Sequence, residues 1–210
     1  MGDEQKGLRD SYNTVAQDYV AHVVPVSRKP FDCALLDQFA ARLVDQGPVW
    51  DLGCGPGDVT RYLSDRELDV IGVDLSEGML DHARKLNPDI TFQRGDMLAL
   101  DAADDSLAGL TAFYSLIHFQ QDQLARVAAE LHRVLRPGGL LLIALHGGDG
   151  QIHLDEWWGR PVQVDTYFHT RDGVEKWLRD SGFSVDDIST RPPYPEIEYP
   201  SERIYALARK

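Results

Sequence analysis

Residues 49–58 read Val49-Trp50-Asp51-Leu52-Gly53-Cys54-Gly55-Pro56-Gly57-Asp58. A short apolar strand runs directly into three glycines separated by single residues, and a helical pattern follows. Glycine permits a tight turn and lets a ligand approach the bare backbone. A second apolar run, at residues 70–73, ends in Asp74. A carboxylate at the tip of one strand, beside a glycine turn at the tip of its neighbour, is how a doubly wound sheet holds a ribose, so the pattern predicts a bound nucleoside or nucleotide.

The glycine spacing argues against a dinucleotide. Dinucleotide-binding loops follow the pattern Gly-x-Gly-x-x-Gly, in which the pyrophosphate lies on a helix N-terminus. Here the pattern from Gly53 is Gly-x-Gly-x-Gly, and Asp58 occupies the position of the third dinucleotide glycine. A carboxylate at that point would repel a pyrophosphate. S-adenosylmethionine (SAM), which has an adenosine, a sulfonium and an ammonium group but no phosphate, suits this loop better.

The segment 49–58 resembles motif I of the class I SAM-dependent methyltransferases. Later segments resemble, in the order of that family, its second-strand motif, its adenine-contacting turn and the loop before its fifth strand. These segments are residues 70–80, Arg94-Gly95-Asp96-Met97 and Leu135-Arg136-Pro137-Gly138-Gly139-Leu140. The resemblance covers most of the chain and is nearest to the small enzymes that methylate metabolites. It implies transfer of a methyl group from SAM to an oxygen, nitrogen or carbon of a small metabolite, with S-adenosylhomocysteine (SAH) as product.

Strand-like and helix-like patterns alternate along the chain, which is typical of α/β proteins. We predict strands near Val49–Leu52, Val70–Asp74, Ile90–Gln93, Leu107–Ser115, Leu140–Ala144, Phe183–Ser189 and Ile204–Ala208. Helical spacing predicts helices at Asp122–Leu135, stopped by Pro137-Gly138-Gly139, and at Arg171–Ser181. The expected fold is a Rossmann-like, doubly wound, seven-stranded sheet with helices on both faces. The resemblance implies that it is mostly parallel with an antiparallel last strand.

Two regions fall outside this pattern. Residues 3–46 look like two helices that precede the first strand, and residues 147–170 link the fifth strand to the next helix. We expect one domain over residues 1–210. The resemblance implies that residues 1–46 form a helical lid and that residues 147–170 are a substrate-side insertion.

The amino-acid composition limits the kinds of molecule that the protein is expected to bind. The net charge of −13 argues against a nucleic-acid substrate, because binding phosphates needs a basic face. No apolar run reaches the length of a membrane span. The chain has only two cysteines, one inside the glycine loop, and a polar N-terminus, so a cytoplasmic location is expected. The expected partner is a small-molecule methyl acceptor, with no nucleic acid and no membrane, and either a monomer or a homodimer fits.

The resemblance implies a set of cofactor-binding residues. Asp74 would accept hydrogen bonds from both ribose hydroxyls, and Asp96 and the Met97 amide would bind the adenine. Asp58 would meet the methionine ammonium group or cap its helix, and Tyr19 would close over the methionine part. The remaining predicted cofactor residues line the loop, the ribose or the end of the fourth strand: Gly53, Gly55, Gly57, Leu75, Met79 and Ser115.

Histidines are the natural candidates for a general base, because they titrate near neutral pH. His118 and His146 follow the fourth and fifth strands, where doubly wound sheets bind ligands, so we predict them as catalytic residues. Aromatic and polar residues in or beside the insertion are candidates for acceptor binding: Trp157, Trp158, Tyr167 and His169. No tight metal-ligand motif is present, and no metal is predicted.

Two other functions stay open at this stage. A non-catalytic SAM-binding protein would retain the same pocket motifs. A nicotinamide-dependent oxidoreductase could share the general fold, although the Asp58 position argues against it.

Overall fold

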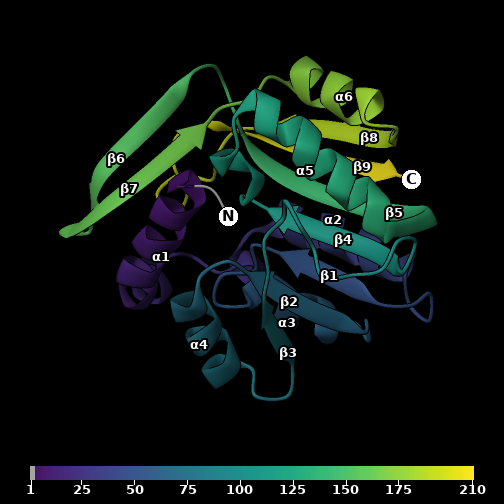
Figure 1. The fold of residues 1–210 in the computed structure, drawn as a ribbon, viewed down its shortest axis with the longest axis horizontal. Coiled ribbons are helices and arrows are strands. Elements are labelled where there is room, and N and C mark those ends of the chain that lie inside the picture. Colours follow the sequence, from purple (N-terminus) through teal and green to yellow (C-terminus); the bar gives the residue numbers. More distant parts are fainter. Residues whose placement is uncertain (1–2) are drawn as a thin grey trace.

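The computed structural model describes residues 3–210, and it centres on one seven-stranded sheet (Figure 1). The strand order is β3-β2-β1-β4-β5-β9-β8. The strands are β1 (Val49–Leu52), β2 (Val70–Asp74), β3 (Thr91–Arg94), β4 (Leu107–Phe113), β5 (Leu135–Gly147), β8 (Ser184–Arg191) and β9 (Glu202–Arg209).

Strand directions confirm the predicted fold class. The pairs that join β3, β2, β1, β4 and β5 are parallel, whereas β9 runs antiparallel to both β5 and β8. All four residues of β1 are buried, as expected for a parallel strand covered on both faces. Because these strands are parallel, their carboxyl ends meet at one edge of the sheet.

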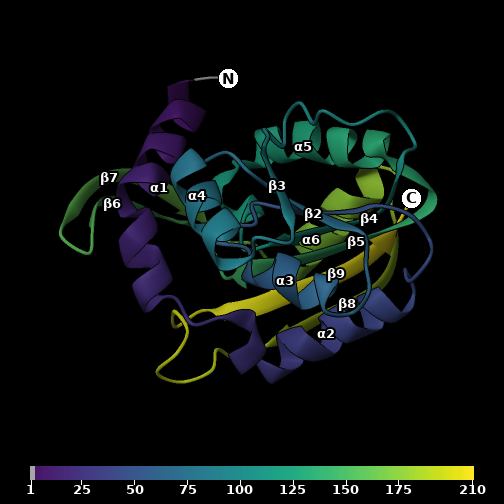
Figure 2. The same cartoon turned by 90° about the horizontal axis from the view of Figure 1, so that it is seen from below.

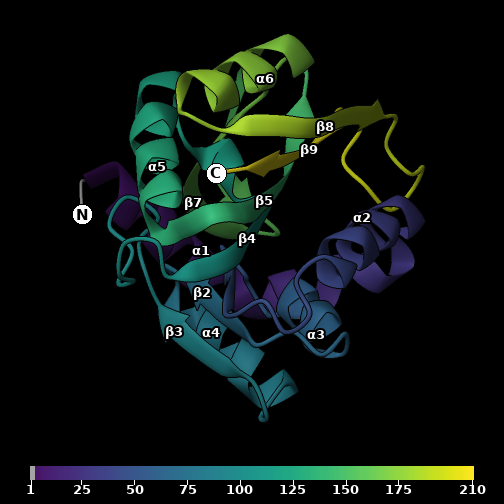
Figure 3. The ribbon, with the colours of Figure 1, turned by 90° about the vertical axis from the view of Figure 1, so that its right-hand side faces the viewer.

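Helices cover both faces of the sheet (Figure 3). On one face α5 (Gln121–Val134) and α6 (Arg171–Asp180) pack on a large apolar core, whereas α2 (Pro30–Ala41) and α3 (Asp58–Ser64) cover a second core on the opposite face. The helix α4 (Glu77–Leu86) packs beside β3, and the Ser76 hydroxyl caps it by accepting a hydrogen bond from Met79 N.

One predicted boundary is wrong. The stretch Pro137-Gly138-Gly139 does not stop the preceding helix, which already ends at Val134. Leu135 adopts an extended conformation and pairs with Leu107, so β5 begins there and contains the stretch. The physical reason is that this stretch is hydrogen-bonded on both sides of β5, because Leu135 pairs with β4 and Gly138 N donates to the carbonyl of Lys210, next to β9, at 2.8 Å.

The segment 147–170 folds as a β-hairpin rather than as an irregular loop. Its strands β6 (Gln151–Trp157) and β7 (Arg160–Tyr167) form a separate two-stranded sheet. The turn consists of Trp158 and Gly159, with φ of 51° and 75°. Positive φ at both positions is the geometry of a type I′ turn, whose twist matches that of a hairpin.

The N-terminal region contains the two predicted helices, α1 (Asp3–His22) and α2, joined through the short 3-10 helix η1 (Val26–Arg28). Figures 1 and 2 show α1 beside the hairpin, beyond the end of the sheet from which β5 leads into β6. Val15 of α1 packs on Val162 and Val164 of β7. Within the described chain, no helix is both long enough and apolar enough to cross a membrane.

Candidate active site

Asp74 lies at the tip of β2, where the structure holds its carboxylate in place. Its Oδ2 accepts a hydrogen bond from Gly55 N and its Oδ1 from Ser76 N, both at 2.8 Å. Burial raises the pKa of Asp74, and the two backbone N–H groups oppose that shift by stabilising the charged form. Each carboxylate oxygen can accept a further hydrogen bond, as two ribose hydroxyls would require.

The glycine loop leaves bare backbone beside this carboxylate. A Cβ on Gly55 would meet no heavy atom within 4 Å, and Gly55 has a φ of +52°. Gly53 is packed more tightly than Gly55, because a Cβ added to Gly53 would lie 2.2 Å from Ser115 Cβ. The Ser115 hydroxyl donates to the Leu52 carbonyl at 2.8 Å and fixes this contact. The loop therefore offers a surface on which a ligand can lie directly on the main chain.

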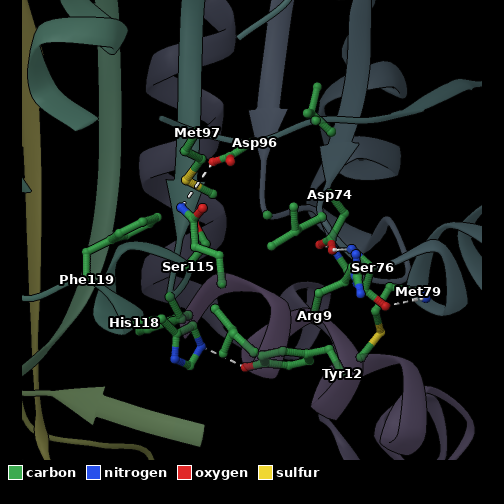
Figure 4. A pocket seen from close by; sticks show the side chains of 18 of the residues that line it. Arg9, Tyr12, Asp74, Ser76, Met79, Asp96, Met97, Ser115, His118 and Phe119 are labelled. Carbon is green, nitrogen blue, oxygen red and sulfur yellow. Dashed lines mark hydrogen bonds between the residues drawn. The ribbon is translucent and has the colours of Figure 1, made fainter. Parts of the chain in front are cut away.

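A central pocket opens beside Asp74 (Figure 4), with about 790 Å³ of empty volume. Asp96 lies in its wall, where its Oδ1 accepts hydrogen bonds from Leu98 N at 2.9 Å and from the Gln5 side chain at 3.2 Å. The structure brings nearly all predicted cofactor residues to this pocket: Tyr19, Gly53, Gly55, Asp74, Leu75, Met79, Asp96, Met97 and Ser115. The pocket thus presents two carboxylates, Asp74 at the end of β2 and Asp96 just after β3.

A loop-side cavity adjoins the central pocket, and both share Tyr19, Gly53 and Gly55. Asp58 lines this cavity, where its Oδ2 accepts a hydrogen bond from Val26 N at 2.7 Å. Asp58 is not the N-cap of α3, which is Gly57, but its carboxylate lies in the first turn of that helix, where the helix dipole favours a negative charge. Gly57 lines none of the three cavities described here, and a Cβ added to it would lie 2.8 Å from the Phe92 ring.

A hairpin-side cavity lies on the other side of the central pocket and has about 1310 Å³ of empty volume. Both predicted histidines line it, and His118 also lines the central pocket. His146 Nδ1 lies 2.8 Å from Ser201 Oγ. Burial, assisted by the positive charge of Arg203, lowers the pKa of His146 to about 3. His146 is therefore neutral at physiological pH.

His118 forms a hydrogen-bonded chain. Its Nε2 lies 2.8 Å from the hydroxyl of Tyr12 (Figure 4), and its Nδ1 lies 2.7 Å from the main-chain carbonyl of Asp165. Burial lowers the pKa of His118 and raises that of Tyr12, so both groups are neutral. The pair stands in the wall that the central pocket shares with the hairpin-side cavity.

The structure separates the predicted acceptor-binding residues. Trp157 lines the hairpin-side cavity. Trp158 is more than one-third exposed and stacks on His22 and Trp157 outside it. Tyr167 lies in a depression on the other side of the hairpin. His169 lines none of the three cavities described above, and its Nε2 is buried without a hydrogen-bond partner among the described atoms.

Several residues that the fold brings to the site were assigned no role there from the sequence. Tyr12 and Arg9 come from α1, and Lys29 borders both the loop-side and the hairpin-side cavities. Asn13 Oδ1 accepts hydrogen bonds from Ser76 Oγ and Gly78 N, which docks α1 over the central pocket. The sequence signal that could have identified them is that Arg9, Tyr12, Asn13 and Lys29 all lie near Tyr19 along the chain.

Among the described side chains, no group of three or more His, Cys, Asp or Glu residues is placed to hold a metal ion. The site is thus built from single carboxylates, aromatic rings and neutral histidines.

Comparison with known proteins places this geometry in context. A family model described as a methyltransferase domain matches residues 49–139. The chain is 30% identical to the malonyl-[acyl-carrier protein] O-methyltransferase of Enterobacter lignolyticus over 182 residues, which cover 86% of this chain and 68% of that protein. It is 38% identical to the demethylmenaquinone methyltransferase of Renibacterium salmoninarum over 96 residues, which cover 46% of this chain and 40% of that protein.

Solved structures show the same fold. The DhpI-SAH complex aligns with a TM-score of 0.71 and 21% identity, covering 98% of this chain and 96% of that one. The present chain spans 35% to 68% of the length of the first curated relatives that it matches.

Proposed function

The chain belongs to the class I SAM-dependent methyltransferases, and we propose that it transfers the methyl group of SAM to a small molecule bound in the hairpin-side cavity. One observation supports this most strongly. The central pocket and the hairpin-side cavity share Tyr12, Tyr19, Tyr114 and His118, so a donor in one and an acceptor in the other can meet. Methyl transfer needs this direct approach, because the two reacting atoms must lie in line.

The residues of the central pocket fit the nucleoside half of SAM. Asp74 holds the ribose hydroxyls, and Asp96 and the Met97 main chain hold the adenine. Met79, of which only 1% is exposed, and Leu75 supply an apolar surface for the rings. This division follows the chemistry of each group, since a carboxylate accepts strong hydrogen bonds and a thioether packs on flat rings.

The loop-side cavity fits the methionine half. Lys29 would meet the carboxylate of that half, and Asp58 its ammonium group, while Tyr19 covers it. SAM supplies a methyl carbon that its sulfonium already activates. The protein then contributes alignment and exclusion of water, with residues 3–46 and the segment 147–170 as the cover over the reacting atoms.

The relatives differ in the molecule that receives the methyl group. The relatives named above act, by their names, on malonyl-[acyl-carrier protein] and on demethylmenaquinone. The cavity itself must therefore decide the acceptor of this chain. His146 contributes a neutral ring with little basicity, which suits hydrogen bonding to an acceptor more than removal of a proton from it.

Turnover with isotopically labelled SAM tests the proposal. The protein is incubated with SAM that carries a trideuterated methyl group and with a panel of small phenols, acids and amines. We expect mass spectrometry to find a labelled product together with an equal amount of SAH. Tight SAH binding without a labelled product from any acceptor would favour the non-catalytic alternative instead.

A further inference from the structure

We propose that the acceptor is a hydroxyl group on a flat aromatic molecule, and that Tyr12 and His118 together receive the proton that this hydroxyl loses. The inference rests on the proposed function, because it concerns the acceptor half of the same site. It adds a substrate class and gives a catalytic role to a tyrosine of α1.

The walls of the hairpin-side cavity are aromatic and apolar. The Trp157 ring lies edge-on to Tyr12 and Tyr19, with centroids 5.8 and 6.0 Å apart. Phe168 and Tyr199 continue this wall, with centroids 6.2 Å apart, and aliphatic side chains fill the space between: Val23, Ile117, Ile152, Leu154 and Val164. Such a surface favours a flat, uncharged molecule.

Of the ionised groups that border this cavity, Glu198 and Arg203 already have partners, and Lys29 borders the loop-side cavity as well. The Glu198 and Arg203 side chains are only 2% and 3% exposed, and Glu198 accepts hydrogen bonds from Arg191 at 2.7 and 3.0 Å. Arg203 donates to main-chain carbonyls of Ser201 and Tyr199. Lys29 borders the loop-side cavity, where the carboxylate of the cofactor would bind. Among the described residues that line this cavity, no second cation besides Lys29 is therefore available to bind the carboxylate of an acceptor molecule.

The hydrogen bonds of His118 define its tautomer. A carbonyl oxygen only accepts, so the 2.7 Å contact with Asp165 O requires a hydrogen on His118 Nδ1. Nε2 of the neutral ring is then an acceptor, and Tyr12 donates its hydroxyl hydrogen to it. The lone pairs of the Tyr12 oxygen can accept a hydrogen bond from an acceptor hydroxyl in the cavity.

The proposed reaction accounts for every proton, electron pair and charge that moves. The acceptor hydroxyl gives its proton to Tyr12 Oη while Tyr12 gives its own proton to His118 Nε2. The electron pair left on the acceptor oxygen forms the new bond to the methyl carbon, and the pair of the broken carbon–sulfur bond stays on sulfur. The positive charge of the sulfonium disappears as that of the imidazolium appears, so the buried site keeps its total charge.

The neighbours of His118 are compatible with this role. Its ring is faced by Tyr12 of α1, by Asp165 of β7 and by His146 of β5. The Asp165 carboxylate, which pairs with His153 Nδ1 at 2.8 Å, favours the charged form of His118. A carboxylate acceptor has no proton to lose and would leave this chain of hydrogen bonds without a function.

A matched series of ligands tests the substrate class. 2-Naphthol, 2-naphthoate and 2-naphthylamine share one flat body and differ in the reacting group. Binding to the SAH-saturated protein is measured by calorimetry, and methyl transfer from SAM by mass spectrometry. We expect 2-naphthol to bind at least tenfold more tightly than 2-naphthoate and to be the methylated compound. Preference for 2-naphthoate, or no binding of any of the three, would overturn the proposal.

Variants test the two residues. Tyr12→Phe and His118→Asn should each lower kcat with 2-naphthol about 100-fold, the range typical of a lost proton acceptor, while the Kd for SAH changes less than twofold. The control is His132→Asn, because His132 lies on α5 against Phe183, far from the cavities. Full kcat in both site variants would refute the role of the pair. Failure of SAH to bind the unaltered protein would instead refute the proposed function.

Discussion

Replacing Asp74 by Asn tests the cofactor assignment with little change in shape. Asn keeps one acceptor oxygen and removes the charge that both ribose hydroxyls would meet. A hydrogen bond to a charged group contributes about 1.5–3 kcal/mol, against about 1 kcal/mol for a neutral pair. Two weakened bonds amount to about 1–4 kcal/mol, so the Kd for SAH should rise about 5- to 900-fold.

The pH dependence of the same equilibrium gives an independent check. Burial raises the pKa of Asp74 above its ordinary value, and binding needs the charged form. The affinity of the unaltered protein for SAH should therefore fall as the pH is lowered from 7 toward the raised pKa. The Asn variant lacks this titration and should lose that part of the pH dependence.

Calorimetric titration with SAH at several pH values measures both effects. The control is Asp186→Asn, because Asp186 pairs with Arg42 and Arg209 away from the pocket. A Kd for the Asp74→Asn variant within threefold of the unaltered protein would refute the assignment of the ribose to this carboxylate.

Further predictions concern the loop, a buried ion pair and a buried acid. Gly57→Ala should lower the free energy of unfolding by about 2–4 kcal/mol in a urea titration, because φ is +87° and a Cβ would lie 2.8 Å from the Phe92 ring. Arg191→Met should cost about 3–5 kcal/mol in the same assay, since it leaves the fully buried Asp32 carboxylate without its cation. Burial raises the pKa of Asp51 to about 7, so the folded state retains a proton that the unfolded chain loses near pH 4. Stability should fall as the pH rises from 4 to 7, and Asp51→Asn should flatten that slope in unfolding curves recorded across this range.

Much of the sheet could be predicted because its strands have clear local signals. Residues 49–52 and 70–74 are apolar runs that end at a glycine or an aspartate, and the structure gives them these bounds. The hairpin gave no such signal. Its turn is Trp158-Gly159 rather than the common Asn-Gly or Asp-Gly pair, and its strands pack on α1, a contact distant in sequence.

Most of the predicted cofactor residues could be brought to one pocket by sequence reasoning because they follow strands whose ends lie at one edge of the sheet, whereas Tyr19 lies on α1. The acceptor residues depend on which face of the hairpin each side chain occupies. Successive strand residues point to opposite faces, so Thr166 and Phe168 line the hairpin-side cavity while Tyr167 lies on the other side. A sequence without a known register cannot assign these faces.

The central claim is that this pocket binds SAM and not a dinucleotide. Calorimetric titration of the protein with SAH, and separately with NADH, tests it most directly. We predict micromolar binding of SAH and no detectable heat of binding with NADH, because Asp58 and Asp74 would repel a pyrophosphate. Binding of NADH, or a lack of SAH binding by folded protein, would contradict the account.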